Sequence, residues 1–246
     1  MRHTITETAL MIERCYEAFQ MQMVGCLMHV LEEPAPTSPG ARARLGATLQ
    51  DAQVQILTTI GSTVSLAAEG LVNEAIQSFN PDLSVPNRKT VTKGIEQARI
   101  EFMQQVARAA SADAMVVTRS MRDFAHQADQ AMSVRGASYT GAVVTARMGM
   151  DTDFKMFQTD SAGRKWPSAL YVKTSARSFL VSTRAETSVY ALAQAGVDTA
   201  VVRYPNPEHP NHGLQFSITG ATPDLPAYPD IRELWHPNSD AYVSKE

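Results

Sequence analysis

The stretch TITETALMIERCYEAFQMQMVGCLMHVL, residues 4–31, decides the fold of this chain. Its apolar residues recur at alternating spacings of four and three, which is the heptad pattern of a helix that buries one continuous seam. Thr4 and Glu7 have the Thr-x-x-Glu spacing of a capping box, which predicts that the helix begins at this point. The seam consists of Ile5, Ala9, Ile12, Tyr16, Phe19, Met23, Cys26 and Val30.

An apolar seam of this kind has two alternative partners. It packs inside a bundle formed by its own chain, or it packs against another copy or another protein. Because the spacing is so regular, the sequence favours neither alternative over the other. We therefore take five seam residues as candidate partner-binding residues, namely Ile5, Ile12, Tyr16, Phe19 and Met23.

Two further long helices are predicted. The sequence EEPAPTSPG at residues 32–40 ends the first helix, because its three prolines and its glycine cannot continue one. Ser38 is the predicted cap of a second helix, with Pro39 in its first turn. The apolar stripe of the second helix contains Leu45, Leu49, Ala52, Ile56, Ile60, Val64, Ala67, Leu71 and Ala75.

After breaks at Pro81 and Pro86, a third helical stretch is predicted from about Val91 to Met132, with Ser111 as a cap that divides it. Its stripe contains Ile95, Ala98, Phe102, Val106, Ala109 and Val116. The later elements are a short helix near 137–148, a strand at 153–159, a turn at 160–163, a helix at 169–195 capped by Gly196, and strands at 197–203 and 214–218. The remaining tail is rich in proline and predicted to be mostly extended.

This order of elements predicts a predominantly helical α+β protein. Residues 1–150 are expected to form long helical hairpins in a bundle or coiled-coil-like region. Residues 151–246 are expected to form a small α+β module with one long helix, a few short strands and an extended tail.

The composition excludes several classes of protein. A net charge of −3 is not that of a protein that neutralises DNA in bulk. The most apolar stretch, residues 21–31, is well short of the ~20 residues that span a bilayer, and no signal peptide is recognisable, so we expect a soluble protein made in a cytoplasm. Cys15 and Cys26 lie about three helical turns apart, too far for an intramolecular bridge.

No motif for catalysis stands out, and we predict neither an enzyme nor a cofactor. The chain has no Gly-x-Ser-x-Gly elbow and no phosphate-binding glycine loop. The alternative is a metal-binding or enzymatic module, because imidazoles in and after the loop PNPEHPNHG (205–213) resemble a metal-ligand set. Its candidate ligands are His209, His212 and His236.

A basic stripe is predicted on the last long helix. Lys173, Arg177 and Arg184 fall within about 40° of one another on a helical wheel. The stripe is either a solvated face or a docking surface for an acidic partner or packaged DNA. A third alternative is the chain's own tail, because residues 161–203 carry a net charge of +4 and residues 204–246 a net charge of −4.

Three pieces of sequence carry a resemblance to a known family. The first is DSAGRKW at 160–166, followed by Tyr171 and Arg177. The second runs from RYP at 203–205 through His209, His212 and Gly213 to FSI at 216–218 and Gly220. The third is Tyr228-Pro229 followed by HPN at 236–238. In this order and spacing they resemble the C-terminal part of tailed-bacteriophage minor capsid proteins, the group related to Mu-type head-morphogenesis proteins, over roughly residues 153–240.

The resemblance implies a structural virion protein of the phage head without enzymatic activity. It implies docking on the portal protein, the major capsid protein or both during head assembly in the host cytoplasm. Apart from the resemblance, the heptad seam makes other copies of the chain candidate partners, and the basic stripe makes packaged DNA a candidate for weak contact. The family's His-Pro-Asn is typically followed by Cys-Arg-His, whereas Ser239, Asp240 and Ala241 follow here, and the cysteine of the preceding loop is also missing. The metal or redox role that those family residues suggest is therefore not carried over.

Overall fold

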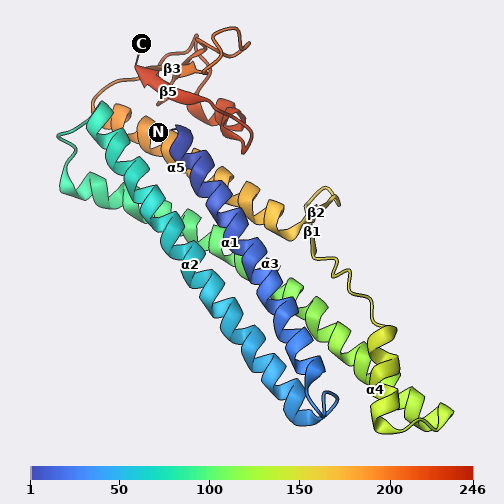
Figure 1. The fold of residues 1–246 in the computed structure, drawn as a ribbon. Helices are drawn as coiled ribbons and strands as arrows, with labels where there is room; N and C mark the ends of the chain where they lie inside the picture. The colour runs from blue at the N-terminus through green and yellow to red at the C-terminus, as the bar shows by residue number, and fades with distance from the viewer. Residues whose placement is uncertain (1, 246) are drawn as a thin grey trace. The chain divides into compact units, whose positions relative to one another are not determined.

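The protein is a predominantly helical α+β chain, as predicted (Figure 1). This computed structural model describes residues 2–245, without the side chains of residues 2–4 and 86. The helices are α1 (Arg2–Glu32), α2 (Pro39–Phe79), α3 (Val85–Arg135), α4 (Tyr139–Met148) and α5 (Ser168–Gln194). The strands are β1 (Phe157–Thr159), β2 (Lys165–Pro167), β3 (Thr199–Arg203), β4 (Gln215–Ser217) and β5 (Tyr242–Lys245), with a 3-10 helix, η1 (Tyr228–Trp235), before β5.

The chain forms two compact units, and each is assembled from several segments. Unit 1 contains Met1–Ile12, Gly61–Gln104 and Lys173–Glu246, and unit 2 contains Glu13–Ile60 and Gln105–Val172. All strands of the described residues follow residue 150, so the predicted change from a helical part to a part with helix and strands is present there. The units do not divide at that point, because α1, α2, α3 and α5 each contribute to both of them.

Helix α1 buries the predicted seam inside its own chain. The helix already runs from Arg2, so Thr4 lies within it rather than at its start, and the Thr4 side chain of the predicted capping box lies outside the described residues. Every predicted seam residue is buried except Cys26, whose place is taken by Leu27. A helix with 3.6 residues per turn drifts away from a strict heptad, which explains this one-residue step.

Helix α2 follows its prediction closely. The Ser38 hydroxyl accepts a hydrogen bond from the Ala41 backbone N–H at 3.1 Å, so Ser38 is the cap. The predicted stripe is buried, with Ala68 replacing Ala67.

Helix α3 corrects the prediction of a division at Ser111. It is one helix of 51 residues, and Ser111 is an exposed residue within it. A serine is compatible with a helix interior when its side chain faces solvent, as that of Ser111 does. The stripe also shifts, because Ala98 is exposed and Val117 rather than Val116 is fully buried.

Unit 2 ends in a short helix and a hairpin. Helix α4 starts at the Ser138 cap, whose hydroxyl accepts a hydrogen bond from the Gly141 N–H at 3.2 Å. Strands β1 and β2 pair antiparallel, with Gln158 opposite Trp166. Only the last three residues of the predicted strand 153–159 are in β1, and β2 was not predicted. Gly163, with φ +77°, sits in the connecting turn where an L side chain is strained.

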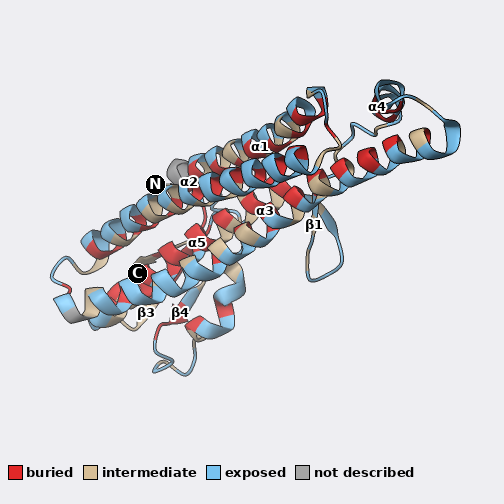
Figure 2. Cartoon of the chain, turned by 90° about the horizontal axis from the view of Figure 1, so that it is seen from below, coloured by how far each residue is buried: buried red, intermediate tan, exposed pale blue. Residues whose placement is uncertain are grey.

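Unit 1 contains a small antiparallel sheet in the order β4-β3-β5. Gly196, with φ +72°, closes α5 as predicted, and β3 follows it. The tail is not mostly extended: η1 packs its Tyr228 and Trp235 rings against Phe216 of β4, and β5 then pairs with β3. Figure 2 shows that buried residues recur along α5 between intermediate and exposed ones. No helix within residues 2–245 is long and apolar enough to cross a membrane.

Candidate functional site

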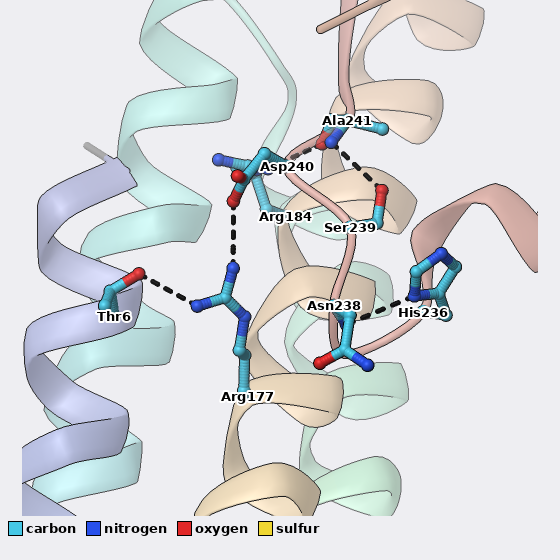
Figure 3. Close-up of polar contacts among 8 residues, drawn as sticks. All are labelled: Thr6, Arg177, Arg184, His236, Asn238, Ser239, Asp240 and Ala241. Atoms are coloured by element: carbon cyan, nitrogen blue, oxygen red, sulfur yellow. Dashed lines mark hydrogen bonds and ion pairs between the residues drawn. The ribbon is translucent and has the colours of Figure 1, made fainter. Parts of the chain in front are cut away.

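The predicted basic stripe meets the chain's own tail in unit 1 (Figure 3). The Arg177 guanidinium donates hydrogen bonds to the Asp240 carboxylate at 2.9 Å and to the Thr6 hydroxyl at 3.0 Å. It thereby connects α5 with the tail and with the first turns of α1. This is the third alternative raised by the sequence, in which the acidic tail pairs with the basic helix.

Arg184 holds the same tail one residue further along. Its side chain is buried, and it donates a hydrogen bond to the Ala241 carbonyl at 2.6 Å. The Ser239 hydroxyl accepts a hydrogen bond from the Ala241 N–H, and His236 Nδ1 accepts one from the Asn238 N–H, so the His-Pro-Asn segment is a closed turn (Figure 3). Lys173, the third predicted residue, is half-buried.

A cavity of about 310 Å³ lies beside this tail. The end of α2, helix α5 and strand β5 surround it, and its polar lining includes Ser78, Arg184 and Ser188. The Ser188 hydroxyl donates a hydrogen bond to the Arg184 carbonyl of its own helix at 2.8 Å.

The predicted histidine ligands are used for structure. His209 stacks on Tyr204 with ring centroids 3.5 Å apart, and its Nδ1 accepts the Asn211 N–H. His212 Nδ1 lies 3.2 Å from the Tyr204 backbone nitrogen and 3.0 Å from the Tyr204 carbonyl oxygen, and its Nε2 lies 3.5 Å from Arg203 Nη1. Among the described residues, no group of three or more His, Cys, Asp or Glu side chains is placed to hold a metal ion.

Two aspartates, Asp198 and Asp160, hold turns together, and this role was not predicted from the sequence for either of them. The Asp198 carboxylate accepts hydrogen bonds from the Ser217 hydroxyl, the Thr222 hydroxyl and the Thr219 backbone, each at 2.8–2.9 Å. The Thr219 hydroxyl also donates to this carboxylate and, with the other three donors, holds the pKa of Asp198 far below its usual range. Asp160 closes the β1–β2 turn in the same way: the Arg164 backbone N–H and the Trp166 Nε1–H donate to it and lower its pKa to about 2.

A third aspartate, Asp113 in α3, lies in the core of unit 2 and was also missed. It is 1% exposed. Its Oδ2 accepts hydrogen bonds from the Tyr16 hydroxyl at 3.1 Å and from Gln20 at 2.8 Å. Its Oδ1 accepts hydrogen bonds from the Ser168 hydroxyl at 2.7 Å and from Gln158 at 3.4 Å. Burial raises the pKa of Asp113 in spite of these four donors. Only a local pattern with period 3.6 is visible in the sequence, and Asp113 lies 97 residues from Tyr16.

The predicted partner-binding seam is corrected by its burial. Ile5, Ile12, Tyr16, Phe19 and Met23 are all less than 5% exposed. The intramolecular alternative therefore describes these five residues, and a partner that leaves the fold intact must bind elsewhere.

No protein-family model, no curated protein and no solved structure matches this chain. The resemblance to minor capsid proteins therefore stays a prediction that depends on the motif residues themselves.

Proposed function

We propose that this chain is a non-catalytic structural protein of a tailed-bacteriophage head. In this role it is a minor capsid protein that docks on the portal protein, the major capsid protein or both, and it remains in the virion. The observation that carries the proposal is a structural role of the motif residues. In each of the three motif segments, polar side chains make hydrogen bonds that hold a turn or the C-terminal tail in place.

Each piece supports this reading in its own way. In the first, Asp160 fixes the β1–β2 turn through Arg164 and Trp166. In the second, His212 is hydrogen-bonded to Tyr204 within the β3–β4 connection. In the third, the His-Pro-Asn turn leads directly into the contacts of Arg177 and Arg184 with the tail. Residues that maintain a rigid shape suit a protein whose role is to join partners.

The β1–β2 hairpin is the part of the motif that we assign to partner contact. Hydrogen bonds to Asp160 close its turn, while Phe157 is 47% exposed and the Arg164 side chain is 69% exposed. Lys165 is exposed as well. Aromatic and arginine side chains are enriched at protein interfaces, and the hairpin exposes one of each. Arg177 and Arg184 are engaged by the tail, so the proposal does not place packaged DNA on that stripe.

The test is co-purification of the tagged chain from cells infected by the phage that encodes it, followed by mass spectrometry of the bound proteins. We expect the portal or major capsid protein to be recovered. The variant Phe157→Ser/Lys165→Glu should reduce that recovery at least several-fold. Arg119→Glu, at an exposed position of α3, should leave it unchanged. Recovery of neither head protein would contradict the proposal.

A further inference from the structure

The core of unit 2 contains one polar layer in an otherwise apolar seam. Tyr16 and Gln20 lie one helical turn apart on α1, so both side chains point to the same face and both reach Asp113 of α3. Tyr16 is fully buried and Asp113 nearly so. The residues of the seam on either side of this layer, Ile12, Phe19 and Met23, are apolar.

Asp113 is a buried carboxylate that neutral groups alone support. Each of its oxygens accepts two hydrogen bonds, from α1 on one side and from β1 and the first residue of α5 on the other. Among the described residues, no lysine, arginine or histidine pairs with it. A buried charge without a counter-charge is not the arrangement that makes a core most stable, because apolar side chains of the same shape do as well or better.

A polar layer instead lowers the free energy of one helix pairing relative to alternative pairings of the same helix. A seam as regular as that of α1 can also pack against the same seam of a second copy. In such a pair α1 no longer faces Asp113, so the Tyr16 hydroxyl and the Gln20 amide lose their acceptor and Asp113 loses two of its four donors. Both losses leave buried polar groups unsatisfied. Pairing of α1 with α3 of its own chain satisfies all of them.

We infer that Asp113, with its donors Tyr16 and Gln20, selects the pairing of α1 with α3 of the same chain over pairing of the α1 seam with a second copy. The inference is independent of the capsid role, since it concerns only how the seam is kept from self-association. Gln158 and Ser168 extend the same network to the hairpin and to the start of α5, so these segments are held in register with α1 and α3.

Two variants distinguish an effect of the polar layer on the choice of helix partner from an effect on the stability of the fold. Asp113→Leu alone leaves buried donors without an acceptor and should lower the thermal midpoint. The apolar-layer variant, Tyr16→Phe/Gln20→Leu/Asp113→Leu/Gln158→Leu/Ser168→Ala, removes the acceptor together with all four of its donors. Its thermal midpoint should return to the wild-type value or exceed it. Arg122→Leu, at an exposed position of α3, is the control for added apolar surface.

The deciding measurement is molar mass by light scattering over a hundredfold range of protein concentration. The apolar-layer variant should at least double its mass with rising concentration, over a range in which the wild type and Arg122→Leu keep theirs. An apolar-layer variant with the wild-type mass at every concentration would overturn the inference. Failure of that variant to fold would also overturn it, because the network would then be needed for folding itself.

Discussion

At the scale of single residues, three aspartates show how surroundings decide the behaviour of one side chain. Hydrogen-bond donors around Asp160 and Asp198 stabilise the charged form and lower the pKa of each. Burial of Asp113 removes water from its carboxylate, and this raises its pKa even though four donors remain. The first two therefore stabilise the fold as anions, whereas the charge of Asp113 opposes folding of unit 2.

We predict that Asp198→Asn lowers the thermal midpoint at neutral pH, because the anion accepts hydrogen bonds from the Ser217, Thr219 and Thr222 side chains. A depressed folded pKa gives stability that is complete above the unfolded value of about 3.9 and declines as the pH falls below it. The gap between wild type and variant in thermal melts should therefore shrink below about pH 4. A gap that stays constant down to pH 2 would contradict this account of Asp198.

Asp113→Asn should show the opposite trend with pH. Because the folded pKa is raised, the wild type loses stability as the pH rises from the unfolded value of about 3.9 through the raised one. The asparagine variant does not titrate, so its midpoint should rise relative to wild type between pH 4 and neutral pH. Thermal melts of both proteins across this interval test the sign, and a relative fall of the variant would refute it.

Local signals predicted the residues whose role depends on near neighbours. The Ser38 cap, the Gly196 cap and most of the α1 seam follow from spacings of three or four residues. The aspartate clusters could not be predicted in this way, because Asp113 and Asp198 obtain their partners through the tertiary fold. Asp198, for example, is 19 residues from Ser217.

At the scale of elements, the end of α5 depends on the backbone of Gly196. Its φ of +72° lets the Val197 N–H reach the Leu192 carbonyl at 3.1 Å and close the helix. We predict that Gly196→Ala lowers the free energy of unfolding by about 1 kcal/mol, because an L side chain is strained in this conformation.

The matched control for Gly196→Ala is Gly70→Ala, in α2 of the same unit. Nothing lies within 4 Å of a side chain at position 70, and the helical backbone suits alanine. This change should raise the free energy of unfolding by about 0.5–1 kcal/mol. Chemical denaturation of the two variants measures both signs, and a loss of stability in Gly70→Ala would contradict the helical assignment there.

The Arg177–Asp240 contact between α5 and the tail should make a small contribution. Asp240 is 54% exposed and Arg177 21% exposed, so water and salt screen the pair. A double-mutant cycle with Arg177→Met and Asp240→Asn should give a coupling energy of about 0.2–1 kcal/mol. The coupling should shrink in 1 M salt. A salt-independent coupling would show that the contact acts through packing.

The lengths and number of the strands could not be predicted from local sequence patterns. Residues 153–159 and 197–203 have strand patterns, yet each strand is shorter than its pattern, because it ends where its partner ends. Strands β2 and β5 have too few residues for a pattern of their own. Helix η1 was missed because its signal is burial of Tyr228 and Trp235 against Phe216, a contact made only in the folded protein.

At the scale of the whole molecule, the long helices set the organisation. A boundary near residue 150 follows from the change of composition, whereas the compact units follow from contacts among segments far apart in the sequence. Because α3 continues without interruption for 51 residues, it belongs to both units, and sequence patterns cannot show where its neighbours change.

The central claim, a structural role in a phage head, is tested most directly by mass spectrometry of purified, DNA-filled virions of the phage that encodes this chain. The account predicts peptides covering both units, at a constant ratio to the portal protein, in preparations that have been washed in high salt. Virions of normal composition and infectivity that contain none of this protein would contradict it.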